Sequence, residues 1–82
     1  MELPALLKMF DMTGKEIRDL KFRQTLRGYN IDDVDVLLEH AAKEVDAGRS
    51  PAELVGGASL RRSLRGYRVE DVDQALSLIG GA

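Results

Sequence analysis

The most informative stretch of the chain is LRGYNIDDVDVLL, residues 26–38, because residues 64–76 repeat it as LRGYRVEDVDQAL. Aligning residues 22–38 with residues 60–76 gives nine identities in 17 positions without a gap. The identical pairs are Arg23 and Arg61, Leu26 and Leu64, Arg27 and Arg65, Gly28 and Gly66, Tyr29 and Tyr67, Asp33 and Asp71, Val34 and Val72, Asp35 and Asp73, and Leu38 and Leu76. Duplication of this kind is more typical of a packed surface than of an active site.

Each copy of the repeat predicts an amphipathic helix. In the first copy the apolar residues step by 3, 4, 3 and 4, at Ile31, Val34, Leu38, Ala41 and Val45, and Leu37 widens that face. In the second copy the steps are 3, 4 and 3, at Val69, Val72, Leu76 and Ile79. Asn30 is a good N-cap for the first helix and Gly48 a suitable end, whereas the second helix has Arg68 at the cap position.

The segments outside the repeat also show helical signals. Residues 13–17 (TGKEI) and 50–54 (SPAEL) both have the Ser/Thr-x-x-Glu spacing of a capping box, and Pro51 suits a first helical position. A short extended piece is expected to follow each of these turns. At the N-terminus, Leu3, Leu6, Leu7 and Phe10 have the spacing of one helical face, which predicts a short amphipathic helix over residues 1–12.

These patterns predict an all-α fold of two repeated units, each a helical turn, an Arg-Gly-Tyr turn and a helix. The first unit spans residues 13–47, and the second spans residues 48–82 including the connector. With 82 residues, neither unit has enough apolar surface for a large core of its own. We therefore expect the two units to pack on each other through their aliphatic faces as a pseudo-two-fold pair.

Composition narrows the functional classes. The chain has 12 basic and 14 acidic residues and no cysteine, so the net charge of −2 does not favour nucleic acid and thiolate metal sites are excluded. The one histidine, His40, is expected at a helix surface, and no ligand cluster, phosphate-binding loop or catalytic set is recognisable. We expect no enzymatic activity, cofactor, metal or small-molecule substrate.

The Arg-Gly-Tyr segment has a structural interpretation. Gly28 and Gly66 are expected to provide turns with positive φ, and Tyr29 and Tyr67 to pack back against the helix starts. In this interpretation the arginines form salt bridges with acidic residues one or two helical turns away, Arg27 with Asp35 and Arg65 with Asp73.

The same residues also resemble a known family. Ile17, Phe22, Arg27, Gly28, Tyr29, Val34, Asp35 and Leu38 match the spacing of the N-terminal module of the DivIVA family of bacterial pole- and septum-marking proteins. The second unit matches it, with one extra residue upstream, at Leu54, Leu60, Arg65, Gly66, Tyr67, Val72, Asp73 and Leu76. The resemblance covers about residues 13–79 and is closest to a short, repeated form of the module.

The resemblance implies a bacterial scaffold linked to cell division or polar growth. It also implies binding to anionic membrane through the residue before Arg-Gly-Tyr and the arginine beside it, here Leu26 with Arg27 and Leu64 with Arg65. In the family two chains each bring one module, whereas here one chain carries both.

Three functional classes follow. A protein-interaction or scaffold module, with a protein partner or self-association, fits best a duplicated helical chain without a catalytic set. A peripheral binder of anionic membrane is the first alternative. A small nucleic-acid-binding protein using Arg61, Arg62, Arg65 and Arg68 is the second.

The expected location is the cytoplasm, with the inner face of the cell membrane for the membrane alternative. The N-terminus lacks the features of a secretory signal.

Overall fold

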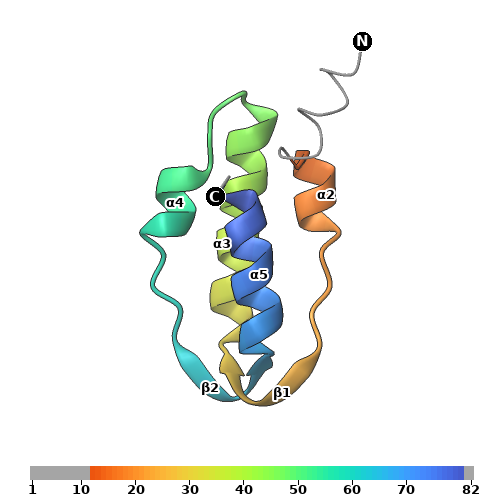
Figure 1. Cartoon of the computed structure of the whole chain (residues 1–82), viewed down its shortest axis with the longest axis vertical. Helices are drawn as coiled ribbons and strands as arrows, with labels where there is room; N and C mark the ends of the chain where they lie inside the picture. The colour runs from red at the N-terminus through yellow and green to blue at the C-terminus, as the bar shows by residue number, and fades with distance from the viewer. Residues whose placement is uncertain (1–11, 81–82) are drawn as a thin grey trace.

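The computed structural model describes residues 12–80, so the helix predicted over residues 1–12 lies almost entirely outside the described residues. The elements, in chain order, are α2 (Gly14–Arg18), β1 (Gln24–Tyr29), α3 (Ile31–Asp46), α4 (Ala52–Gly56), β2 (Arg62–Tyr67) and α5 (Val69–Ile79) (Figure 1). Each unit thus contributes a short helix, a strand and a longer helix, with a turn of one residue between strand and longer helix.

The prediction of an all-α fold is wrong, because the structure contains a two-stranded sheet. Residue Gln24 lies opposite Tyr67, Leu26 opposite Arg65 and Gly28 opposite Ser63. The strands are antiparallel, since the partner number falls as the strand number rises. The segments expected as isolated extended pieces and turns instead satisfy their backbone groups by pairing with each other.

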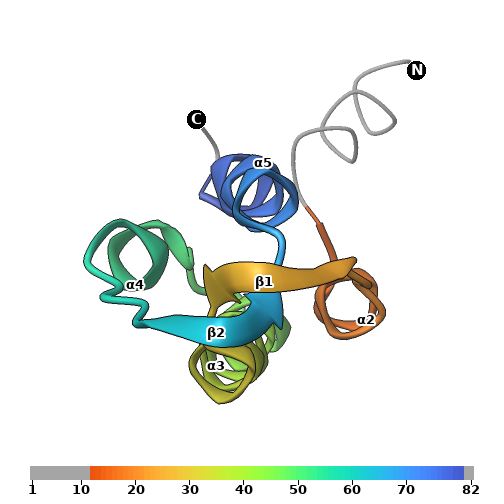
Figure 2. The same ribbon diagram turned by 90° about the horizontal axis from the view of Figure 1, so that it is seen from below.

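The two strands cross at one end of the molecule, and the two longer helices leave this crossing in the same direction (Figure 1). Seen along the helices, the crossing lies between α3 and α5, while α2 and α4 flank the pair on opposite sides (Figure 2). The backbone N–H of Asn30 donates to the carbonyl oxygen of Arg61, and that of Arg68 to the carbonyl oxygen of Arg23, both at 2.8 Å. The two bonds extend the pairing to the start of each helix.

One hydrophobic core joins the elements of both units. Val34 and Val72, which occupy the same position of the repeat, are both fully buried. The buried cluster comes from α2, α3 and α5 and consists of Ile17, Val34, Leu38, Ala41, Ala42, Val72 and Ile79. The helical faces predicted from spacing are confirmed apart from their first residues, with Val45 and Leu76 half-buried against the cluster and Leu37 buried beside it. Ile31 and Val69, at the helix starts, are half-buried and lie outside the cluster.

The N-caps predicted from the sequence are found in the first unit but not in the second. The capping box of Thr13 and Glu16 is confirmed, and the Asn30 side chain accepts a hydrogen bond from the N–H of Asp33. The capping box expected at residues 50–53 is wrong: helix α4 begins at Ala52, after Pro51, and has no side-chain cap. Arg68 likewise gives α5 no side-chain cap.

Candidate interaction site at the strand crossing

The two glycines of the Arg-Gly-Tyr segments lie where the strands cross. Both are buried, and neither has a positive φ, so the prediction that they provide left-handed turns is wrong. Their role is close approach: a Cβ atom built on Gly28 would overlap the carbonyl oxygen of Tyr67, and one on Gly66 would overlap that of Tyr29. The repeat therefore requires glycine because each backbone passes directly over the other.

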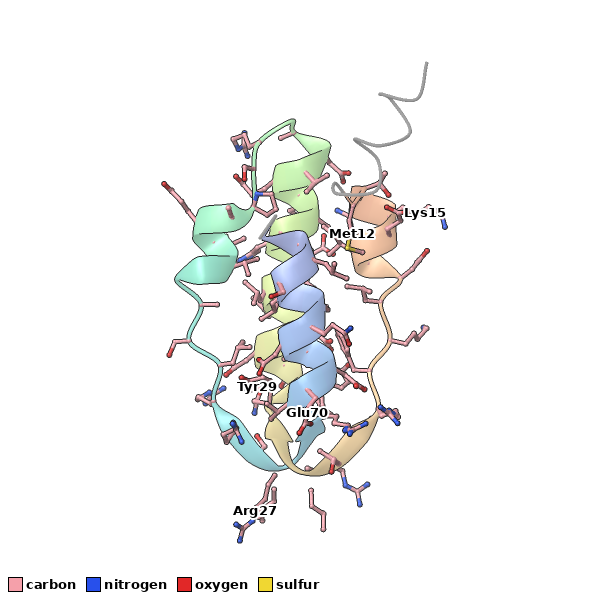
Figure 3. The ribbon with its side chains drawn as sticks, in the orientation of Figure 1. Met12, Lys15, Arg27, Tyr29 and Glu70 are labelled. Carbon is pink, nitrogen blue, oxygen red and sulfur yellow. The ribbon has the colours of Figure 1, made fainter. Side chains whose placement is uncertain are left out.

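The crossing exposes two leucines at the end of the molecule. The exposed fractions are 73% for Leu26 and 80% for Leu64, the largest among the large hydrophobic side chains of the described part. Leu26 lies opposite Arg65 in the sheet. Arg27 points away from the rest of the protein at this end (Figure 3). We call these four residues, Leu26, Arg27, Leu64 and Arg65, the tip.

The two arginines of the tip do not form the salt bridges that were predicted from the sequence. Within residues 12–80, neither Arg27 nor Arg65 forms a salt bridge, so the predicted pairing with Asp35 and Asp73 is wrong. Arg27 also has a φ of 62°, a left-handed conformation that costs a non-glycine residue about 1–2 kcal/mol. The strain is tolerated because the paired residues on both sides fix the backbone.

A different pair of arginines joins the two units. Arg23 donates from Nε and Nη2 to the Asp71 carboxylate at 3.2 Å each, and Arg61 donates to Asp33 at 3.0 and 2.9 Å. Both pairs are bidentate, and each connects the strand entry of one unit to the helix start of the other. This geometry fixes orientation as well as supplying energy.

The tyrosines make a second reciprocal pair of contacts. The Tyr29 hydroxyl donates to Asp73 at 2.8 Å, and the Tyr67 hydroxyl donates to Asp35 at 3.0 Å. Their rings are half-buried against the core, as predicted, but each hydroxyl contacts the helix start of the opposite unit and not the one that follows it in sequence. Asp35 and Asp73 thus accept from tyrosine in the opposite unit, not from arginine in their own.

The rings of the two tyrosines have different neighbours. The guanidinium of Arg62 lies 5.0 Å from the centre of the Tyr29 ring, within the range of a cation–π contact. The Tyr67 ring instead has Phe22 beside it, with ring centres 5.3 Å apart. The hydroxyl contacts are thus reciprocal, while the packing of the rings is not.

These contacts shift several pKa values. Hydrogen bonds from the Arg61 side chain and then from its backbone lower the pKa of Asp33 to about 2. The Arg23 side chain lowers the pKa of Asp71 in the same way. The bond to Asp73 raises the pKa of Tyr29, and burial followed by the bond to Asp35 raises that of Tyr67. At neutral pH the carboxylates are therefore charged and the tyrosines remain hydrogen-bond donors.

Most residues that the repeat singled out gather at this end of the molecule, but in an arrangement that spacing did not reveal. The pairs Arg23–Asp71 and Arg61–Asp33 were missed, although all four residues are identities of the internal alignment. That recurrence was an available signal. The sequence interpretation considered salt bridges within one unit only. In the structure each arginine pairs with an aspartate of the other unit, because the strands cross.

The basic cluster considered for nucleic acid is divided among several contacts. Arg61 pairs with Asp33, Arg68 lies 3.4 Å from Glu70, and Arg62 lies over the Tyr29 ring. Arg65 stands at the tip with an exposed side chain. Three of the four arginines therefore already have a contact within the protein.

The described part of the chain shows neither a metal-binding cluster nor a helix able to span a membrane. Among residues 12–80, no group of three or more histidine, cysteine or acidic residues is placed to hold a metal ion, and His40 is exposed on α3. No helix there combines the length and the apolar character that crossing a bilayer requires.

Comparison with known proteins gives one partial likeness. No protein-family model matches the chain, and no solved structure matches it. Cell cycle protein GpsB of Levilactobacillus brevis is 49% identical over 37 residues, which cover 45% of this chain and 32% of GpsB. The chain thus spans about a third of the length of that relative. The match supports a likeness to the DivIVA family over part of the chain and does not test whether both units share it.

Proposed function

We propose that this chain is a non-enzymatic interaction module of the DivIVA type, which presents its tip to a protein partner in bacterial cell division or polar growth. The observation that carries the proposal is the position of Leu26 and Leu64, both strongly exposed at the end of a rigid strand crossing. The partial likeness to a cell cycle protein supports the process. The module acts in the cytoplasm.

The tip stands on a part of the molecule in which the two units are firmly connected. Two bidentate arginine–aspartate pairs and two tyrosine–aspartate hydrogen bonds connect the units directly behind the tip. At the two buried glycines the strand backbones lie in direct contact, with no space between them for a Cβ atom. A surface held in this way loses little conformational entropy when a partner binds, so a small contact area suffices for specific binding.

The side chains of the tip combine apolar surface with positive charge. Each exposed leucine stands beside an arginine in sequence, and Leu26 also faces Arg65 across the sheet. Leucines and arginines without salt-bridge partners in the described part suit a partner surface with an apolar patch bordered by carboxylates. A charged amphipathic helix combines both features on one face, so the kind of partner we propose is a second scaffold protein that presents such a helix.

The test is site-specific crosslinking in the native host. A photo-reactive amino acid replaces Leu26 or Leu64 in the full chain, and in matched controls it replaces Val36 or Leu78, which are also exposed but lie on the helices. We expect a discrete protein adduct from the two tip positions and none from the helix positions. Mass spectrometry of the adduct then identifies the partner.

Two outcomes contradict the proposal. If the four positions give the same adducts, the contact is not specific to the tip. If the tip positions give no protein adduct while the protein is expressed and folded, the tip does not bind a protein.

The exposed leucines and arginines also favour a second candidate function, adsorption to the inner face of the cell membrane. Leu26 and Leu64 can enter the interface between headgroups and acyl chains while Arg27 and Arg65 contact anionic headgroups. Each basic residue near such a surface contributes about 1 kcal/mol. With two leucines and no lipid anchor, binding by one molecule is weak and reversible.

Vesicle co-sedimentation tests this candidate. We expect the full chain to pellet with vesicles containing phosphatidylglycerol and not with neutral vesicles, and the double variant Leu26→Asp, Leu64→Asp to remain in solution. The control is Val36→Asp with Leu78→Asp, which adds the same charge elsewhere on the surface. Equal pelleting of both double variants, or no pelleting of the unmodified chain, removes the membrane candidate.

A further inference from the structure

A hollow of about 430 Å³ lies at the start of α5, beside the strand crossing. Among the described residues, its lining includes three arginines, Arg27, Arg62 and Arg68, and a single carboxylate, that of Glu70. Thr25, which bears a hydroxyl group, also lines it. Arg27 and Glu70 lie at the same end of the molecule (Figure 3). The lining therefore has an excess of positive charge, which favours an anionic ligand.

This excess of arginine is specific to the second unit. The repeat provides a corresponding set of residues in the first unit, and two of the arginines are replaced there by uncharged amides. The corresponding pairs are Arg62 and Gln24, Arg68 and Asn30, Arg27 and Arg65, and Glu70 and Asp32. The set in the first unit thus has one arginine and one carboxylate, with no excess charge. The comparison attributes the positive charge of the hollow to Arg62 and Arg68.

Both of these arginines keep hydrogen-bond donors for a ligand, because a guanidinium group carries several N–H groups in one plane. The guanidinium of Arg62 lies 5.0 Å from the centre of the Tyr29 ring, and such stacking is compatible with donation to an anion. The Nε atom of Arg68 lies 3.4 Å from the Glu70 carboxylate, with exposed side-chain fractions of 41% and 75%. An ion pair this exposed contributes little, so a ligand of higher charge can displace Glu70.

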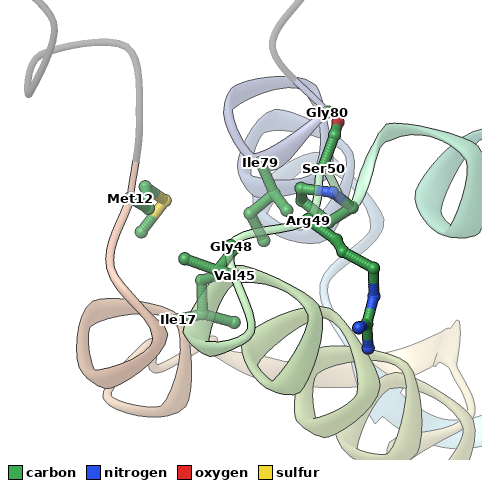
Figure 4. Close-up of a pocket in the computed structure, with 9 residues that line it drawn as sticks. Met12, Ile17, Val45, Gly48, Arg49, Ser50, Ile79 and Gly80 are labelled. Atoms are coloured by element: carbon green, nitrogen blue, oxygen red, sulfur yellow. The ribbon is translucent and has the colours of Figure 1, made fainter.

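Charge distinguishes this hollow from another of similar size. At the opposite end of the molecule, a hollow of about 360 Å³ has the apolar side chains of Ile17, Val45 and Ile79 around it (Figure 4). Its one charged lining residue in the described part, Arg49, forms a bidentate pair with Glu44 at 2.9 Å. The lining of that hollow is therefore apolar and its charge is balanced, which does not favour an anion.

We propose that the hollow at the start of α5 binds a phosphate monoester, with Arg62 and Arg68 donating to the phosphate oxygens. Such a group carries a charge of about −1.5 to −2 at neutral pH, which balances the excess positive charge of the lining. A guanidinium group can donate to two phosphate oxygens at once. The volume leaves room for part of the molecule that carries the phosphate. The inference goes beyond the proposed function, because it requires neither a protein partner nor the exposed leucines.

NMR titration of the full chain with glycerol 3-phosphate, at neutral pH and constant ionic strength, tests the proposal. We expect saturable shifts of the Nε–H signals of Arg62 and Arg68 and of the backbone amide of Glu70, with a dissociation constant in the millimolar range. The signals of Gln24 and Asp32, the corresponding residues of the first unit, should shift several-fold less. Shifts that do not saturate, or shifts of equal size in the two units, overturn the proposal.

The matching variant is Arg62→Gln with Arg68→Asn, which gives the second unit the residues that the first unit has. Binding should weaken about ten-fold or more, because hydrogen bonds between charged groups are lost. The control, Lys15→Gln with Lys43→Gln, removes the same charge from exposed positions outside the hollow and should bind like the unmodified chain. Circular dichroism verifies that both variants are folded. Equal weakening in the two variants would show that binding follows the net charge of the molecule, which overturns the proposal.

A second experiment separates the two sources of a phosphate monoester, a small soluble molecule and a lipid headgroup. Vesicles containing phosphatidic acid present the monoester at their surface. If the unmodified chain pellets with them and the variant Arg62→Gln, Arg68→Asn does not, the site accepts the lipid headgroup. If the two pellet equally, or neither pellets, while glycerol 3-phosphate binds as expected, the site takes soluble phosphates. Either result supports the site, and the titration alone decides whether it exists.

Discussion

The strand crossing and the flanking helices of this molecule differ in symmetry. At the crossing, the four contacts that aspartates accept from the opposite unit form two equivalent pairs: Arg23 with Asp71 and Arg61 with Asp33, Tyr29 with Asp73 and Tyr67 with Asp35. Val34 and Val72 are both fully buried. A Cβ atom built on either strand glycine would meet equivalent backbone atoms of the opposite strand. The centre is therefore a two-fold arrangement within one polypeptide.

The flanking helices are unequal. Helix α2 has a complete capping box, a fully buried Ile17, and Arg18, which reaches both Glu39 and Asp46 on α3. Helix α4 has no side-chain cap and no buried residue. The nine identities of the gap-free alignment lie in the segments that form the crossing and in the first half of the long helices. The two units are thus alike at the crossing, where they contact each other, and differ in the flanking helices α2 and α4.

The largest effects are expected at the crossing, and they should be equal in the two units. Gly28→Ala and Gly66→Ala each place a methyl group on a backbone carbonyl of the opposite strand, which cannot move aside. We expect each to lower the free energy of unfolding by about 3 kcal/mol or more, measured by urea denaturation followed by circular dichroism. That is a large part of the stability of a chain this size.

Gly56→Ala is the control for this pair, because a Cβ atom there meets nothing within 4 Å and the residue lies in a helix. It should leave stability unchanged or raise it slightly. Two glycine variants that differ strongly from each other, or a mild effect of both, would show that the crossing is not the symmetric close contact described here.

The second prediction concerns the unequal flanks. Ile17→Ala removes a fully buried side chain and should cost about 2–5 kcal/mol. Leu54→Ala, at the corresponding place in α4, removes a side chain that is only half-buried and should cost about half as much or less. The same denaturation experiment compares the two, and equal losses would mean that α4 contributes as much to the core as α2.

The third prediction is a loss of stability in acid. The folded-state pKa of Asp33 is about 2, below its ordinary value of 3.8, so the charged carboxylate stabilises the fold. That contribution is complete above about pH 4 and is lost as the pH falls from there through 2. Asp71 acts in the same direction. Thermal melting between pH 5 and pH 2 should show a decline that is smaller in Asp33→Asn.

Carboxyl ¹³C NMR titration provides a direct check on the cause. In Arg61→Gln the pKa of Asp33 should rise toward its ordinary value, because the guanidinium donors are gone. In the unmodified protein, Asp71 should titrate above Asp33, since the backbone N–H of Arg23 lies 3.4 Å from its carboxylate and that of Arg61 lies 3.0 Å from Asp33. The reverse order would point to other charges as the dominant influence.

The helices of this protein could be predicted from its sequence because residue spacing and cap residues within one short segment are enough to indicate a helix. Spacing identified the buried faces of α3 and α5, and cap residues identified the start of α3 and the capping box of α2. The exposed leucines of the tip were selected through the family resemblance, and no pattern within the chain alone indicated that they face solvent.

The sheet could not be predicted in the same way, because its information is not local. The strands are 38 residues apart, and each is too short and too polar to show a clear alternation of its own. The glycines were interpreted through backbone freedom, while the structure uses them for close approach, which depends on a partner segment elsewhere in the chain. The salt bridges were missed for the same reason, since their partners lie in the other unit.

The smallest effect is expected from giving α5 the side-chain N-cap that α3 has and α5 lacks. Arg68 has φ −59° and ψ 127°, nearly the values of Asn30, −55° and 127°, so its backbone already has the geometry that an asparagine cap uses. Arg68→Asn should add a side-chain acceptor for the N–H of Asp71 and raise stability by about 0.5–1 kcal/mol. The lost contact with Glu70 is exposed and subtracts little.

The matched variant is Asn30→Ala, which removes the existing cap and should cost about 1 kcal/mol, with a further loss from its bond to Ser63. Urea midpoints measure both changes. If Arg68→Asn lowers stability while Asn30→Ala does so as well, the cap is not what separates the two helices. The cause must then lie further along the chain, where α3 continues for five residues beyond the point at which α5 ends.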